Sequence, residues 1–241
     1  MLFFCFSVKD RLPLINSFNQ YIGNFGIDTW YDRRNIFIGD KRYEENIKNG
    51  AKNPNVKYAI VFYSSNFING NICLDEYDIL VDRYKNREIS IFPVFLGKSP
   101  EQIDKRFGLC KELVFKEIFS CNDFFALSLH IVAKIVNDML KPHNCQNIKD
   151  YLNKSTEKNI ALDLLKEYEN INKNNLAMRV SFLFCIFKSI TYGKTVQYFF
   201  YKTMSFLYYK NCINPIIDEK RELQIMESIV LIESLRLFPV L

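Results

Sequence analysis

The sequence has little glycine and almost no histidine. Its 241 residues include 8 glycines and 2 histidines. Neither GxGxxG nor GxxxxGK followed by Ser or Thr occurs, so the loops that hold a dinucleotide or the phosphates of a nucleoside triphosphate are missing. There is also no GxSxG sequence, which α/β serine hydrolases need. These absences argue against a dehydrogenase, a P-loop NTPase and a serine hydrolase.

Paired cysteines, long apolar runs and basic clusters are missing as well. The 7 cysteines form no CxxC pair, so we expect no structural metal and a reducing, cytoplasmic location. The apolar stretch at 180–187 ends at Lys188, far short of the roughly 20 residues of a membrane span. The chain reaches Lys9 too soon for a signal peptide. A net charge of +5 without a basic cluster predicts neither a nucleic-acid nor a membrane partner.

The first 120 residues contain short apolar runs that alternate with segments of helical length. This pattern is typical of a parallel sheet covered on both faces. We expect an α/β, flavodoxin-like fold with a five-stranded parallel sheet of order 2-1-3-4-5. The expected strands are residues 2–7, 27–30, 58–63, 89–95 and 112–115, and the expected helices are residues 10–24, 40–50, 72–86 and 123–140.

The stretch Lys141-Pro142-His143-Asn144 marks the clearest boundary, because proline disfavours continuing a helix. The prediction is therefore one domain over 1–141 and a second over 142–241. No alternation of strands and helices returns in the second part, which we expect to be all-α and to serve as an interface or a sensor. Its expected helices are residues 156–171, 176–191, 195–210 and 216–236.

A ligand site is expected at the carboxyl ends of the first and third strands, where the strand order reverses. No acidic cluster follows either strand, as a magnesium-binding receiver domain would require. Glu76 lies in the next helix and is placed near this site by topology. The plain alternative is that it complements the helix dipole in a first helical turn, which contributes roughly 0.3–1 kcal/mol.

Four segments, in order, resemble the conserved segments of Toll/interleukin-1 receptor (TIR) domains. FFCFSVKDR resembles the first box, and IDTWYDRRNIFIGD resembles the second strand and the BB loop. IVFYSSNFINGNICLDE is similar to the third strand with its S-x-W-C-x-x-E segment, and ISIFPVFLG to the fourth strand. These segments begin at residues 3, 27, 60 and 89. The resemblance covers residues 1 to about 140.

The resemblance implies an enzyme that cleaves the nicotinamide–ribose bond of NAD+ as its substrate, without a cofactor, and releases ADP-ribose or a cyclic product. It implies that Glu76 is the catalytic glutamate and that Cys73 keeps the family spacing before it. Phe6 and Ser7 would border the ribose or nicotinamide, and Ser64 would contact it from the third strand. Three further substrate-binding residues are implied in the BB-like loop, with an aromatic ring for a base and an arginine for phosphates: Asp32, Arg33 and Phe37.

Active members of the family often assemble so that the BB loop of one subunit completes a neighbour's pocket. The resemblance therefore implies a homo-oligomer, in a microbial effector that acts in antiviral defence and innate immunity. The alternative is a non-enzymatic TIR adaptor that works by self-association. Glu76 favours the enzyme, whereas Ile72, at the family's tryptophan position, and Cys5-Phe6 in the first box leave room for the adaptor. The helical region would sense a protein or nucleotide trigger.

Overall fold

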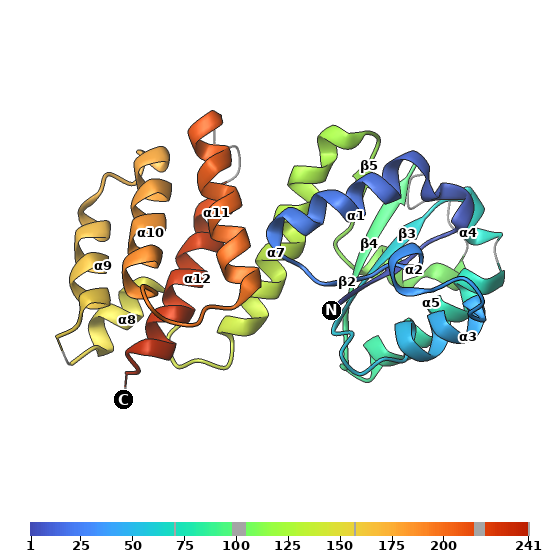
Figure 1. The fold of residues 1–241 in the computed structure, drawn as a ribbon, viewed down its shortest axis with the longest axis horizontal. Helices are drawn as coiled ribbons and strands as arrows, with labels where there is room; N and C mark the ends of the chain where they lie inside the picture. Colours follow the sequence, from blue (N-terminus) through green and yellow to red (C-terminus); the bar gives the residue numbers. More distant parts are fainter. Residues whose placement is uncertain (70, 98–104, 157, 215–219, 241) are drawn as a thin grey trace. The chain divides into compact units, whose positions relative to one another are not determined.

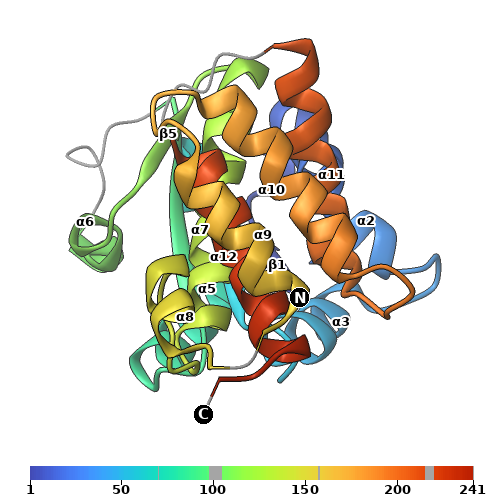
Figure 2. The same cartoon turned by 90° about the vertical axis from the view of Figure 1, so that its left-hand side faces the viewer.

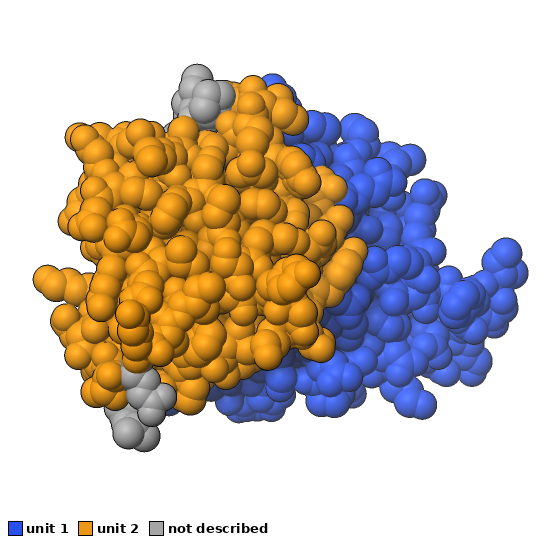
Figure 3. Space-filling view, turned by 60° about the vertical axis from the view of Figure 1, so that its left-hand side comes forward, with its two compact units in different colours: residues 1–23, 27–127 blue, residues 24–26, 128–241 orange. Residues whose placement is uncertain are grey.

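The computed structural model describes residues 1–240 except 70, 98–104, 157 and 215–219, and it leaves the side chains of residues 71, 72 and 105 undescribed. The chain forms two compact units (Figure 3). Unit 1 comprises Met1–Gly23 and Ile27–Leu127, and unit 2 comprises Asn24–Gly26 and Ser128–Leu241. The predicted boundary after Lys141 stays a prediction.

Unit 1 is built around a five-stranded parallel sheet of order β2-β1-β3-β4-β5. The sheet and the all-α second part confirm the predicted fold class (Figure 1). Strands that are apolar along their whole length are stable here because both faces of the sheet are covered. The strands are β1 Leu2–Cys5, β2 Thr29–Trp30, β3 Tyr58–Tyr63, β4 Ser90–Leu96 and β5 Lys116–Ile118.

The fifth strand differs from its prediction at 112–115, which was wrong. Glu112 ends a short helix, and β5 begins at Lys116, which pairs with Val94 of β4. Val114 of the apolar run is 87% exposed. β5 is an edge strand held by backbone pairing on one side only, so its residues need no continuous apolar pattern.

Alternate residues of the strands pack on opposite faces of the sheet. Phe4 and Phe62 contact Phe18 of α1, which also packs against Phe124 at the start of α7. On the other face, Tyr63 packs edge-on against Tyr77 of α5. Figure 1 shows α1 on one side of the sheet and α3 and α5 on the other. The helices named here are α1 Asn16–Ile22, α3 Arg42–Glu45, α5 Asn71–Lys85 and α7 Phe124–Leu140.

Two predicted helices are divided into shorter pieces. The segment predicted at 10–24 is interrupted at Leu12, whose backbone is extended (φ −110°, ψ 140°), because a residue before proline avoids the α region. The segment predicted at 40–50 divides into α3 and η4. The short elements are η1 Val8–Asp10, η2 Arg11–Ile15, η3 Gly23–Phe25, α2 Asp32–Asn35, η4 Asn46–Ala51, α4 Ser65–Ile68, η6 Lys105–Phe107, α6 Leu109–Glu112 and η7 Cys121–Asp123.

Unit 2 is helical, and α10 packs against α9, α11 and α12 (Figures 1 and 2). Val180, Leu183 and Phe187 of α10 are fully buried. Arg179 lies over the ring of Tyr168, with 3.9 Å between the guanidinium carbon and the ring centroid. The helices that follow α7 are α8 Ile148–Lys154, α9 Ile160–Asn170, α10 Leu176–Ile190, α11 Tyr198–Ile213 and α12 Arg221–Leu237.

Candidate active site

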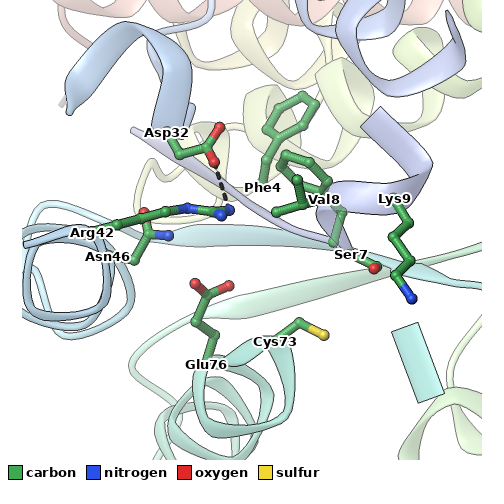
Figure 4. Close-up of a pocket in the computed structure, with 10 residues that line it drawn as sticks. Phe4, Ser7, Val8, Lys9, Asp32, Arg42, Asn46, Cys73 and Glu76 are labelled. Atoms are coloured by element: carbon green, nitrogen blue, oxygen red, sulfur yellow. Dashed lines mark hydrogen bonds and ion pairs between the residues drawn. The ribbon is translucent and has the colours of Figure 1, made fainter. Parts of the chain in front are cut away.

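A pocket of about 390 Å³ lies in unit 1, beyond the carboxyl end of β1 and against α5. This is the edge at which β1 lies between β2 and β3, so the strand order reverses there. Apolar rings and aliphatic groups line one wall, and charged and amide side chains line another (Figure 4). The lining residues are Phe4, Phe6, Ser7, Val8, Lys9, Asp32, Arg42, Asn46, Cys73 and Glu76.

Glu76 is the buried carboxylic acid of α5 that faces this pocket. The helix begins at Asn71, so Glu76 is in its second turn and the expectation of a first-turn position was wrong. The residue is only 4% exposed, and its carboxyl group points toward Arg42 and Asn46 (Figure 4). The helix dipole acts mainly on the first turn and on exposed groups. It therefore does not explain why a carboxyl group is buried here.

Burial raises the pKa of Glu76 to about 8, because a charged carboxylate loses its hydration in the pocket. The positive charge of Arg42 opposes this rise, and hydrogen bonding with Cys5 and Asn46 opposes it further. The negative charge of Asp32 adds to it. Near neutral pH, Glu76 therefore takes up or releases a proton in response to small changes in its surroundings.

Two thiols lie beside Glu76. Cys73 lines the pocket, and Cys5 donates a hydrogen bond from its Sγ to the carbonyl oxygen of Cys73 at 3.6 Å. Burial raises the pKa of Cys73 to about 11 and that of Cys5 well above its ordinary value. Both thiols are therefore neutral at physiological pH and are poor nucleophiles.

Asp32 is the first residue of α2, and two arginines hold its carboxylate. Nη1 and Nη2 of Arg11 donate to its two carboxylate oxygens, and Nη2 of Arg42 donates to Oδ2 at 2.9 Å. Arg11 also lies over the rings of Phe6 and Tyr31, which are stacked with their centroids 5.6 Å apart. This network fixes the positions of Phe6 and Asp32, which both line the cavity.

Ser64 is near the site but is not among the residues that line the pocket. Its side chain accepts a hydrogen bond from the backbone N–H of Phe67 and so caps α4, and its hydroxyl donates to Asp10. Asp10 also accepts a hydrogen bond from Asn66. These contacts tie the segment after β1 to the segment after β3.

The structure brings together five of the residues predicted from sequence, Phe6, Ser7, Asp32, Cys73 and Glu76. Arg33 and Phe37 are exposed and do not line this pocket, and Phe37 is 75% exposed. The substrate-binding role of each predicted residue stays a prediction. The side chain of Ile72, on which the adaptor alternative partly depended, lies outside the description.

Sequence reasoning missed Arg42 and Asn46, which enter the pocket from α3 and η4. They are four residues apart, so they share one face of the segment predicted as a helix at 40–50. That spacing was the available signal, but it did not show which face meets Glu76. Val8 and Lys9 belong to the segment after the first strand, which was expected to border the site, and Phe4 completes the lining that was not predicted.

The site offers two carboxyl groups, a guanidinium, an ammonium and an amide beside apolar side chains. Among the described residues, no group of three or more His, Cys, Asp or Glu side chains is placed to hold a metal ion. Such a pocket is suited to stabilising positive charge on a small polar ligand that is partly apolar. The five lining residues predicted from sequence came from topology and from a resemblance between motifs.

Comparison with known proteins gives one family. The family model described as TIR domain matches residues 2–124. No curated protein matches the chain. Within the part of the chain that the structure describes, no helix is both long enough and apolar enough to cross a membrane.

Proposed function

Since the chain belongs to the TIR domain family, we propose that it cleaves NAD+ between nicotinamide and ribose, with Glu76 as the catalytic residue. The observation that carries this proposal is a carboxyl group that is 4% exposed and faces a pocket at the switch point of the sheet. Burying a carboxyl group lowers the stability of a folded protein, so a carboxyl group that is buried in a pocket points to a use in function. In this proposal, the use is stabilisation of the transition state.

The chemistry needs few groups. The bond between the ribose C1′ and the pyridinium nitrogen breaks, both of its electrons go to the ring, and nicotinamide leaves as a neutral molecule without a general acid. The ribose then carries oxocarbenium-like positive charge, which the carboxylate of Glu76 stabilises. Attack by water gives ADP-ribose and one proton, whereas attack by a nucleophile within ADP-ribose gives a cyclic product.

The pocket residues have corresponding roles in this proposal. Phe6 and Ser7 face the ribose and nicotinamide from the segment after β1, and Asn46 orients the carboxyl group of Glu76. The exposed positions of Arg33 and Phe37 are consistent with a second subunit that supplies its loop to this pocket. In this role the protein is a homo-oligomeric NAD+-consuming effector of microbial antiviral defence, and unit 2 responds to a protein or nucleotide trigger.

The first test is NAD+ loss, followed by chromatography with product identification, for wild type and Glu76→Gln over a wide range of protein concentrations. We expect wild type to release nicotinamide and Glu76→Gln to be slower by about 100-fold or more, because the amide is isosteric but carries no charge. Glu44→Gln is the matched control, since Glu44 of α3 is exposed and pairs with Lys41, the residue before that helix.

Equal NAD+ loss in wild type and Glu76→Gln would remove Glu76 from the mechanism. A folded wild type that assembles but leaves NAD+ intact would favour the second candidate, an adaptor that acts by self-association. One observation supports that candidate: Phe37 and Ile38 form an adjacent pair of exposed apolar residues, and Ile38 is fully exposed. Apolar pairs of this kind mark association surfaces when they are part of a larger patch.

A further inference from the structure

The side chain of Arg42 is the strongest feature of the pocket that the proposed reaction leaves unused. Its guanidinium donates a hydrogen bond from Nη2 to Oδ2 of Asp32 at 2.9 Å, and the side chain is 43% exposed. Figure 4 shows that it extends along the pocket wall above the carboxyl group of Glu76. Arg42 is thus held from one side and faces the reacting carboxyl group on the other.

The charge of Arg42 acts on Glu76 against the negative charge of Asp32, and Asp32 also pairs with Arg11. Arg11 donates to both carboxylate oxygens of Asp32, and both side chains are 9% exposed. In such a bidentate pair, each carboxylate oxygen accepts a hydrogen bond, and the two opposite charges attract each other at close range. The cluster of Arg11, Asp32 and Arg42 therefore carries a net charge of +1, and Arg42 is the arginine of this cluster that lines the pocket.

The other groups around Glu76 supply less positive charge. Cys73 precedes it on α5, Cys5 faces it from β1, and Asn46 faces it from η4, and these three side chains are neutral. Lys9, from η1, lines the pocket at some distance from the carboxyl group in Figure 4. Asp75 points elsewhere, since it accepts a hydrogen bond from the hydroxyl of Tyr43.

We propose that Arg42 is a positioning residue that stabilises the charged form of Glu76, and that Asp32 holds Arg42 in place for this role. The inference rests on the proposed function for its catalytic meaning, because the reaction uses the carboxylate and not the acid. In this role, Arg42 sets the pH range in which Glu76 is charged and the site is active. Arg42→Lys therefore retains part of the effect, whereas a neutral side chain at this position does not.

The direct experiment is a titration of the Glu76 carboxyl carbon by NMR, with ¹³C-labelled glutamate and with Glu76→Gln to assign the signal. We compare wild type with Arg42→Gln, Arg42→Lys and the matched control Lys41→Gln, which removes the same charge from an exposed neighbouring residue. In Arg42→Gln we expect the midpoint to rise by about one pH unit or more. Lys41→Gln should leave it in place, and Arg42→Lys should restore part of the shift.

The same variants are then compared by kcat/KM for NAD+ between pH 6 and pH 10. The rising limb of the profile should move to higher pH in Arg42→Gln by the same amount as the NMR midpoint. Identical midpoints in wild type and Arg42→Gln overturn the inference, whether or not NAD+ is cleaved. A shifted midpoint in a protein that leaves NAD+ intact overturns the proposed function and retains the coupling between Arg42 and Glu76.

Discussion

At the scale of single residues, Glu76 makes the stability of the protein depend on pH. Its pKa is raised from 4.5 to about 8 in the folded chain, so the folded state binds the proton more tightly than the unfolded state. The stabilising contribution of the protonated form is fully present below pH 4.5 and is lost as pH rises through 8. We expect Glu76→Gln to match wild type near pH 5 and to exceed its unfolding free energy by about 1–3 kcal/mol at pH 9.

Chemical denaturation at pH 5, 7 and 9 measures this difference, and Glu44→Gln again serves as the exposed control. If Glu76→Gln is less stable than wild type at every pH, the carboxyl group contributes structural hydrogen bonds that outweigh its burial. A stability gain at high pH combined with lost NAD+ cleavage would instead indicate a residue retained for activity at the expense of stability.

At the scale of elements, η4 depends on a glycine at its close approach to the sheet. A Cβ on Gly50 would lie 2.5 Å from the ring of Phe3 and 2.7 Å from Nε1 of Trp30. Both rings are buried, so neither has room to move. We expect Gly50→Ala to lower the unfolding free energy by about 1–3 kcal/mol through overpacking. It should also disturb Asn46, since Trp30 donates a hydrogen bond to Asn46 Oδ1 at 3.4 Å.

Gly23→Ala is the matched control for this prediction. Its backbone is already helical (φ −59°, ψ −23°) and a Cβ there meets nothing within 4 Å. That substitution should be neutral or slightly stabilising. Thermal unfolding of the two variants tests the idea, and equal melting temperatures would show that the packing of η4 relaxes easily.

At the scale of the whole molecule, the proposed function includes a neighbouring subunit that completes the pocket. Phe37 is exposed and does not line the pocket, so the proposal requires that it act on another copy of the chain. We expect Phe37→Ser to lose NAD+ cleavage with little change in melting temperature, because it removes no buried contact. Mixing Phe37→Ser with Glu76→Gln should restore activity, since an intact Glu76 and an intact Phe37 then meet at some interfaces.

Sedimentation of the same mixtures reports whether the copies associate. Restored activity that appears only at concentrations where the mixture associates supports the shared site. A mixture that associates and stays inactive would mean that Phe37 does not complete the pocket of another copy. Phe37 would then act within its own chain or contribute only to association. The control mixture is Phe37→Ser with wild type. It should be at least as active as wild type alone, measured at the concentration that wild type has in the mixture.

The sequence by itself determined the sheet, because β1, β3 and β4 are apolar along their length and alternate with helical segments. It also determined where Glu76 lies, since the ends of parallel strands meet at one edge and α5 follows β3. It misplaced β5 because an edge strand is held by backbone pairing, which leaves only a weak pattern in the sequence.

Only the tertiary structure decided how the charges around Glu76 are arranged. Arg42 and Asn46 are far from Glu76 in sequence, and nothing local shows that α3 and η4 turn these two side chains into the pocket. The pairing of Arg11 with Asp32 likewise joins residues from separate elements. Burial and long-range charge are properties of packed neighbours, so the chemistry expected from Glu76 became specific only when the fold placed those neighbours around it.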